Sequence, residues 1–309
     1  MIWLGSRRGY ITDWLTQRWV QLTGRRADLF SEPWLAGPIA PTTGIGADYF
    51  TSLASREGLQ LEASDGAAGI VSTFTSLRGA TFDPSLIHPS VAHFYERTAS
   101  YELDAWAHWC GFFRPFGWLL AKLFSRRLQQ LNVPLSGLDT SRSLSNEVLQ
   151  LRDPATNLTR HTVWLRRLHG SGNVLYAGFY SVCVIPGHAD PCIKVVFPLP
   201  NGNAIVVMRT EAGPDGSFTV TSAGEHFGDP GFYFTVHDGS GTVWARYVRA
   251  MRESIHVFPV ERGELRADHV LKFFGATFLR LHYRMRLQPN ADSIKATDSI
   301  QGDEARGRD

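Results

Sequence analysis

The chain has 309 residues, of which 43% are hydrophobic and 19% charged, a composition typical of a folded globular protein. Its formal net charge of +2 excludes the strong positive field that draws proteins to nucleic acid, so we expect no nucleic-acid partner. The three cysteines lack the spacing of a disulfide framework, which favours a reducing compartment. The first residues make a poor signal peptide, and no run approaches the roughly 20 apolar residues of a spanning helix. We therefore expect a cytoplasmic protein whose contact with a membrane, if any, is peripheral.

The first 145 residues are predicted to be mainly helical and rich in loops. Apolar residues recur at helical spacing from Ile11 to Leu22, and Gly24 is a suitable stop, which predicts a short amphipathic helix. Because the apolar stripe of a helix usually faces a core, we interpret this helix as docked on the main body by its Trp-bearing face. Its basic residues make a membrane-surface position the alternative.

Three further helices are predicted in this part of the chain. The first covers residues 48–57 and ends before Gly58. The second begins at Pro89, which suits a first helical position, and extends to Trp109 because apolar residues recur on one helical face. The third spans residues 116–131 and is predicted to form a hairpin with the second.

The last two helices combine basic and aromatic side chains. No acidic residue occurs between Asp104 and Asp139. The basic residues of this stretch are Arg114, Lys122, Arg126 and Arg127. An anionic membrane surface attracts such a helix by ~1 kcal/mol for each basic residue near the headgroups. The alternative is a helical hairpin packed on a sheet, with its charged groups in water.

From residue 146 onward the hydrophobic period changes to two, the period of strands. Turn sequences such as the Asp-Gly-Ser-Gly of residues 238–241 separate about ten strands between residues 146 and 287. Residues 288–309 are polar and are predicted to be disordered. The predicted fold class is α+β, with a helical N-terminal region (1–145) packed on a large C-terminal antiparallel sheet or barrel (146–287).

A ligand cavity follows from this architecture if the strands close into a barrel, because eight strands already enclose room for a small ligand. The strand at 174–185 is apolar on both faces, so both of its faces should be covered. Polar residues that interrupt the apolar pattern are candidate ligand contacts: Tyr176, Tyr180, Lys194, Arg209, Arg246, His256, His269 and His282. Tyrosine and arginine side chains can hold a carboxylate or phosphate while aromatic walls hold an apolar body.

The last predicted strand, 277–287, carries a strongly basic face. Arg280, His282, Arg284 and Arg286 alternate with apolar residues and therefore share one side of the strand. If this side faces the cavity, Arg280, His282 and Arg284 join Tyr176, Tyr180 and Arg246 in binding the anionic end of a ligand. The alternative is that the basic side is the solvated face of an edge strand, where charge blocks edge pairing.

Two loops carry groups capable of chemistry. The segment 186–192 brings His188, Asp190 and Cys192 together, and the segment 224–231 holds Glu225, His226 and Asp229. Neither segment has a zinc-binding spacing, so we assign no metal and no cofactor. We favour the second loop as a catalytic candidate, with His226 as an acid or base assisted by Asp229 or Glu225.

No motif in the chain identifies a reaction. The leading hypothesis is therefore binding of an apolar small molecule with an anionic end, lipid-like or polyketide-like, in the barrel cavity. The first alternative is an enzyme, such as a cyclase, isomerase or hydrolase, that acts on an apolar substrate through the histidine of 224–231. The second alternative is a peripheral membrane interaction protein that uses Arg114, Lys122, Arg126 and Arg127.

Overall fold

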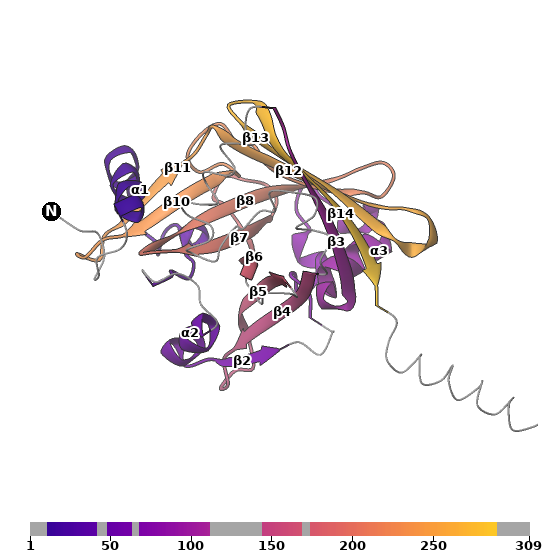
Figure 1. Cartoon of the computed structure of the whole chain (residues 1–309), viewed down its shortest axis with the longest axis horizontal. Helices are drawn as coiled ribbons and strands as arrows, with labels where there is room; N and C mark the ends of the chain where they lie inside the picture. Colours follow the sequence, from indigo (N-terminus) through magenta and orange to yellow (C-terminus); the bar gives the residue numbers. More distant parts are fainter. Residues whose placement is uncertain (1–10, 42–47, 64–67, 112–143, 169–173, 289–309) are drawn as a thin grey trace, which may run out of the picture.

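The computed structural model describes residues 11–41, 48–63, 68–111, 144–168 and 174–288. Within these ranges the helices α1 (Ile11–Thr23), α2 (Tyr49–Glu57) and α3 (Pro89–Glu96) accompany one antiparallel sheet of 14 strands. The strands are β1 (Arg25–Ala27), β2 (Gln60–Ala63), β3 (Tyr101–Trp109), β4 (Leu144–Arg152), β5 (Thr159–Leu168), β6 (Val174–Cys183), β7 (Cys192–Leu199), β8 (Gly202–Ala212), β9 (Phe218–Ser222), β10 (Phe232–His237), β11 (Val243–Tyr247), β12 (Met251–Pro259), β13 (Leu265–Phe273) and β14 (Ala276–Leu287). The α+β class predicted from the sequence is confirmed (Figure 1).

The first two predicted helices are present as α1 and α2. The second ends as its sequence indicates, because Gly58 adopts a left-handed conformation with φ of 67° and its N–H donates to the carbonyl groups of Ala54 and Ser55. Pro89 occupies the first turn of α3, as predicted. The predicted hairpin helix at 116–131 lies outside the described residues.

The helix predicted from Pro89 to Trp109 is wrong beyond Glu96, where the chain turns into strand β3. Tyr101, Leu103 and Ala105 are buried while the residues between them are more exposed, which is the alternation of a strand. The error has a simple cause, because residues four apart share a face in a helix and also in a strand. The stripe that continued at this spacing from α3 to Trp109 therefore could not distinguish the two.

The sheet is open and larger than predicted. Along its main path the strand order is β2-β4-β5-β6-β7-β8-β9-β12-β13-β14-β3. The predicted ten strands and barrel closure are not confirmed, because 14 strands are present and the path ends at β2 and β3. Strand β8 is the branch point, since residues 202–206 pair with β10 while residues 209–212 pair with β9. The additional strands include β1, β2 and β3 from the region that was predicted to be mainly helical.

The sheet bends around a first hydrophobic core, here called the inner core. Figure 1 shows β12, β13, β14 and β3 crossing over one end of the molecule, with α3 beside them. Buried side chains meet in this core from α3, from the short 3₁₀ helix Phe74–Leu77, from Phe82 and Ile87 on either side of the 3₁₀ helix Pro84–Leu86, and from strands on both sides of the bend. It contains several aromatic contacts, including an edge-to-face pair between Phe74 and Phe218 with ring centroids 5.0 Å apart.

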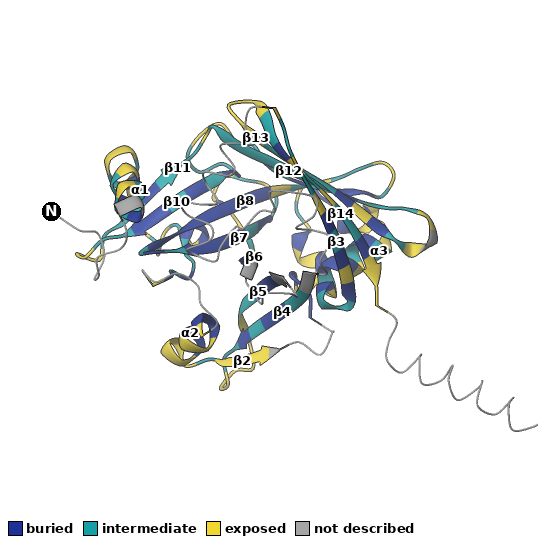
Figure 2. Cartoon of the chain, in the orientation of Figure 1, coloured by how far each residue is buried: buried dark blue, intermediate teal, exposed yellow. Residues whose placement is uncertain are grey.

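A second hydrophobic core, here called the outer core, lies on the opposite face of β4 to β8. Strand β7 shows the arrangement, because Ile193 and Val195 enter the inner core whereas Cys192 and Val196 enter the outer core. Residues of α2 and the 34–40 segment cover this second face. Figure 2 shows the central strands buried along most of their length. The prediction that β6 is apolar because both faces are covered fits this arrangement, since Phe179 packs outward and Val182 packs inward.

The two ends of the bent sheet approach each other beside the inner core. The Nδ2 atom of Asn146, on β4, donates to the carbonyl oxygens of Thr98 and Tyr101 at 2.8 and 2.7 Å. The same amide accepts a hydrogen bond from the indole of Trp164 on β5. A side-chain amide therefore links β4 to the start of β3, where a closed barrel would have a ladder of backbone hydrogen bonds.

Candidate functional site

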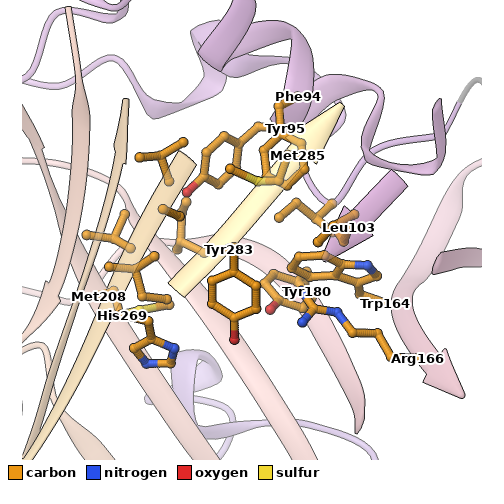
Figure 3. Close-up of a pocket in the computed structure, with 16 residues that line it drawn as sticks. Phe94, Tyr95, Leu103, Trp164, Arg166, Tyr180, Met208, His269, Tyr283 and Met285 are labelled. Atoms are coloured by element: carbon orange, nitrogen blue, oxygen red, sulfur yellow. The ribbon is translucent and has the colours of Figure 1, made fainter. Parts of the chain in front are cut away.

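A cavity of about 90 Å³ lies in the inner core, next to the place where the sheet ends approach (Figure 3). Its walls come from α3 and from β3, β5 to β9 and β12 to β14. Because both arms of the bent sheet contribute, the cavity is a product of the curvature, whereas the sequence analysis expected a cavity only from closure into a barrel. This volume is enough for several water molecules or a small apolar group.

One part of the cavity wall is apolar. Phe94, Leu103 and Met285 line it, and all three are buried. Tyr95 lies beside them (Figure 3), and burial raises the pKa of its phenol, so this hydroxyl is neutral at physiological pH. This part of the wall therefore offers contacts for an apolar group and carries no charge.

Arg166 supplies the charge in the wall. Its guanidinium carbon lies 3.9 Å from the ring centroid of Trp164 and 5.1 Å from that of Tyr283, on β14. The residue is only 8% exposed, an uncommon degree of burial for an arginine. Two aromatic faces stabilise the cation in this desolvated position. Figure 3 shows the guanidinium next to Tyr180 and Tyr283, apart from Phe94 and Tyr95.

Polar atoms gather around this guanidinium. Tyr180 and Tyr283 bring phenol groups from β6 and β14, while His269, from β13, lines the cavity on the far side of Tyr283 (Figure 3). His269 is held by Glu253, with 3.1 Å between Nε2 and the carboxylate oxygen Oε2 and little solvent exposure of either side chain. The cavity is thus amphipathic, with hydrogen-bonding groups and a cation on one side and hydrocarbon on the other.

The structure places few of the predicted ligand-binding residues on this cavity. Tyr180 lines it, while Tyr176 lies on β6 with a side chain outside the described set. Arg246 lies elsewhere, on β11, where its guanidinium donates to the carbonyl oxygen of Thr23 and stands 5.9 Å from the ring of Trp19. Its role in the structure is to hold α1 against the sheet.

The basic face of β14 points to solvent, so it does not contribute to the cavity. Arg280 and His282 are exposed, and His282 pairs with Asp268 at 2.6 Å. Arg284 pairs with Glu264 at 2.5 Å and lowers the pKa of that carboxyl through their hydrogen bond. The strand is nevertheless not an edge strand, because β3 pairs with it over nine residues. Ion pairs with residues of neighbouring segments account for His282, Arg284 and Arg286 without a ligand.

Sequence reasoning missed Arg166, although a signal was present. Thr162, Trp164 and Arg166 share one face of β5, and Trp164 is a large apolar residue on that face. An arginine that interrupts the apolar face of a covered strand meets the same criterion that selected Tyr180 and His269. In the sequence, the turn that precedes β5 is a clearer signal than the side chains of β5 that face inward.

The two loops selected from the sequence meet at a second site, an open groove of about 540 Å³. His188 in the first loop points its Nε2 at the carbonyl oxygen of Gly228 (3.0 Å) and at Oδ1 of Asp229 (3.5 Å) in the second. Burial of Asp229 favours its neutral form, but hydrogen bonds from the N–H groups of His226 and Glu225 outweigh this, and its pKa is lowered. Asp229 is therefore a carboxylate at neutral pH and orients His188.

The histidine predicted to be catalytic does not line this groove. His226 is exposed, and its backbone N–H, not its ring, contacts Asp229. Glu225 lines the groove but is held in ion pairs by Arg249 and Arg252. Among the predicted catalytic residues, Asp229 is thus the one brought against an imidazole, and that imidazole belongs to the other loop.

A third groove, of about 580 Å³, lies over the outer core and contains Lys194. The ammonium group donates to the carbonyl oxygen of Ala36 at 3.0 Å. Burial lowers the pKa of Lys194, and nearby Cys183 opposes that shift. Glu57 and His161, paired at 2.7 Å, line the same groove.

The described residues contain neither a metal-binding cluster nor a membrane-spanning helix. In the described ranges, no three or more His, Cys, Asp or Glu side chains are arranged to hold a metal ion. None of the helices in these ranges is long and apolar enough to cross a membrane.

Comparison with known proteins gives a match to a distant relative. No family model and no solved structure matches the chain. The chain is 24% identical over 241 residues to a protein of Bacillus subtilis (strain 168) named "Uncharacterized membrane protein YndJ". The matched region covers 77% of this chain but 41% of that protein, so the chain spans less than half the length of its relative.

Proposed function

We propose that the chain binds a small molecule with an apolar body and an anionic end in the inner-core cavity. The observation that carries the proposal is the desolvated cation of Arg166 in a wall whose remainder is largely hydrocarbon. An arginine so placed attracts carboxylate or phosphate oxygens, and the phenol groups of Tyr180 and Tyr283 can donate further hydrogen bonds to them.

The cavity volume narrows the class of ligand. A space of about 90 Å³ encloses a few non-hydrogen atoms and not a complete long-chain lipid. The lipid-like or polyketide-like ligand therefore places one ring or the end of a chain among Phe94, Leu103 and Met285. Its anionic group reaches Arg166.

Calorimetric titration of the purified protein tests the proposal. Straight-chain carboxylates from butanoate to decanoate are compared with the alcohols of the same length, which present the same hydrocarbon without the charge. We expect the carboxylates to bind more tightly than the alcohols, with affinity rising along the series until the cavity is filled. Absence of binding, or equal affinity for acid and alcohol at every length, would falsify the proposal.

A second candidate function is acid–base catalysis in the groove between the two loops. The observation that favours it is the orientation of His188 by Gly228 and Asp229, because an Nε2–H directed at these acceptors leaves Nδ1 as the basic nitrogen. Thr210, which lines the same groove, has a buried hydroxyl that lacks a hydrogen-bond partner among the described residues. A substrate with polar groups can satisfy this hydroxyl while His188 moves a proton.

The catalytic candidate is tested by incubating the protein with a metabolite extract and following every mass peak over time. We expect His188→Asn to abolish any turnover found with the wild-type protein. His226→Asn is the matched control, because His226 lies in the adjacent loop with an exposed ring, and it should retain turnover. Equal turnover in wild type and His188→Asn rejects the assignment.

We also keep a cytoplasmic location with peripheral contact to a membrane as a proposal. The name of the Bacillus relative, which calls it a membrane protein, supports a membrane association. The residues first considered for this contact, Arg114, Lys122, Arg126 and Arg127, lie outside the described part of the chain. Charge reversal at Arg126 and Arg127 followed by vesicle co-sedimentation tests them directly.

A further inference from the structure

Helix α1 is docked on the sheet by the buried Val20 and by two polar side chains, and Trp19 packs beside them on Phe234 of β10 with ring centroids 5.9 Å apart. Asp13 and Gln17 are each 5% exposed, and Val20, one turn further, is fully buried. The Nε2 atom of Gln17 donates to the carbonyl oxygen of Pro200 at 2.9 Å. The expectation that the helix docks by its Trp-bearing face holds for Trp19, and the hydrogen bond from Gln17 adds to this contact.

Leu15 and Leu22 lie on the side of α1 that faces away from the sheet, and Trp19 lies at the edge of this side, where part of its ring stays exposed. Leu15, Trp19 and Leu22 are 56%, 39% and 80% exposed, and their spacing of four and three residues places them on one face. We call these three residues the α1 stripe. Figure 2 shows the exposed side of α1 at the periphery of the molecule, away from β10 and β11. An apolar stripe in this position has a favourable environment only when another surface covers it.

The charges near the α1 stripe are predominantly positive. Arg18 lies on the helix itself, next to Trp14, and Arg26 is exposed just after the helix. Arg246 stands 5.9 Å from the ring of Trp19. The acidic residue of α1, Asp13, is buried on the opposite side. The stripe is thus bordered by cations with no exposed carboxylate on the helix.

We propose that the α1 stripe is a docking surface for an anionic lipid bilayer. Leucine and tryptophan enter the boundary between headgroups and acyl chains, and arginines beside them contact lipid phosphates and carboxylates. A membrane fits this surface better than a protein partner does. Acyl chains accept the apolar stripe and headgroups accept the adjacent arginines, and neither contact requires polar partners at defined positions. The proposal is independent of the inner-core cavity and concerns a different surface from residues 114–127.

Vesicle co-sedimentation of the full chain tests the proposal. Phosphatidylcholine vesicles with and without phosphatidylserine are compared, and the variant Leu15→Gln/Leu22→Gln is compared with wild type. Replacing the two leucines should lower the partition coefficient on mixed vesicles roughly tenfold or more, since each loses the gain from burying a leucine side chain. Leu158→Gln is the control, because Leu158 is equally exposed but lies in the turn between β4 and β5. It should bind as wild type does.

A second arm isolates the charge. Arg26→Glu should weaken binding to the mixed vesicles and leave binding to pure phosphatidylcholine unchanged. Raising the ionic strength from about 0.1 M to about 1 M, which shortens the screening length from about 10 Å to about 3 Å, should remove the preference for phosphatidylserine. Circular dichroism of each variant verifies that the fold is intact.

Three results overturn the proposal. The first is absence of wild-type binding to vesicles that contain phosphatidylserine. The second is unchanged vesicle binding in the double leucine variant while Arg126→Glu/Arg127→Glu abolishes it, which assigns the membrane contact to the other segment. The third is loss of self-association in the double leucine variant, measured by sedimentation velocity, with vesicle binding unchanged, which identifies a second copy of the chain as the occupant of the stripe.

Discussion

The guanidinium of Arg166 lies over the ring of Trp164, two residues earlier on the same strand, with its carbon 3.9 Å from the ring centroid. Neighbouring side chains on one face of a strand do not normally bury a cation, because charge is costly to remove from water. Here the indole on one side and Tyr283 from the far end of the sheet on the other provide the cation with two aromatic faces. Strands β5 and β14, from the two arms of the bent sheet, thus meet at the buried guanidinium of Arg166.

The first prediction follows from that charge. Arg166→Met keeps an unbranched side chain of similar length but removes the cation, so carboxylate affinity should fall by about 1.5 to 3 kcal/mol, the usual contribution of a hydrogen bond to a charged group. Affinity for the matching alcohol should change little. Titration calorimetry measures both. Arg284→Met, on the outer face of β14, is the control and should leave both affinities unchanged.

If Arg284→Met lowers the carboxylate affinity and Arg166→Met leaves it unchanged, the ligand binds at the basic face of β14 and not in the cavity. Arg166→Lys separates charge from packing, because lysine keeps the charge but loses the planar stacking on Trp164. We expect it to retain part of the carboxylate preference. If it behaves as Arg166→Met does, packing and not charge determines the affinity.

The second prediction concerns the cavity itself. Ala267 is buried on β13 and lines the cavity, so Ala267→Leu places additional carbon atoms in empty space and should change the free energy of unfolding by less than about 1 kcal/mol. Ala177→Leu, in the fully packed outer core, should destabilise by about 1 to 3 kcal/mol. Urea denaturation measures the difference. Equal destabilisation by both substitutions indicates that the inner core has no usable space, and Ala267→Leu should also abolish ligand binding.

The third prediction concerns pH. Burial opposes ionisation of Asp190, but hydrogen bonds from the Thr81 hydroxyl and from the N–H groups of Thr81 and Phe82 outweigh it, so the pKa of Asp190 is lowered from 3.8. A carboxyl with a lowered pKa in the folded state contributes stability above its unfolded pKa and loses it as the pH falls through the folded value. Asp190→Asn should therefore cost about 1 kcal/mol at pH 7, a modest value because the site is solvent-accessible.

The difference between Asp190→Asn and wild type should begin to shrink as the pH falls below 3.8. Urea denaturation at a series of pH values measures it. Asp48→Asn is the control, because Asp48 precedes α2 with an exposed side chain that makes no capping hydrogen bond. A difference that persists unchanged in acid shows that Asp190 acts through shape and not through charge.

The fourth prediction concerns Lys194. Burial lowers its pKa from 10.5, so the neutral, nucleophilic amine forms at a lower pH than in an ordinary lysine. The rate at which trinitrobenzenesulfonate modifies Lys194 should therefore reach half its maximum at a pH below 10.5. Peptide mass spectrometry measures the extent of modification. Exposed Lys272 serves as the internal reference for reagent concentration.

The same shift predicts the direction of a stability effect. Since the folded state disfavours the charged amine, the unfolded state binds more protons, and the contribution of Lys194 to stability improves as the pH rises toward 10.5. Lys194→Met should flatten this rise in the free energy of unfolding. A labelling profile centred at or above 10.5 contradicts both expectations.

The sheet could be predicted from the sequence because most of its strands carry their own signals. Strand β14 shows the period of two, and its predicted bounds, 277–287, lie within a residue of the observed ones. Strand β3 could not be predicted in this way, because it follows α3 without a break in its apolar spacing. Its partner β14 is distant in sequence, and local patterns contain no information about such pairing.

The candidate site was harder to predict than the fold for a related reason. The sequence shows which residues share a face of a strand, but not which face lies inside a bend. Arg280 and Arg166 each interrupt an apolar pattern, and the curvature of the sheet makes the first exposed and the second buried. Likewise His188 and Asp229 lie on separate loops, so their contact depends on the pairing of distant strands.

The pairing of β3 with β14 also determines the order of events in folding. Arg286 on β14 hydrogen-bonds to Asp104 on β3 across 182 positions of sequence, and the two strands lie side by side in Figure 1. During synthesis β3 emerges early, and its partner strand is made only after the rest of the sheet. Contacts of such large sequence separation carry a high entropic cost and form slowly. Until β14 is complete, the apolar side of β3 and the inner core beneath it stay open to water, so this last ladder is the step at which the nascent chain is most exposed to aggregation.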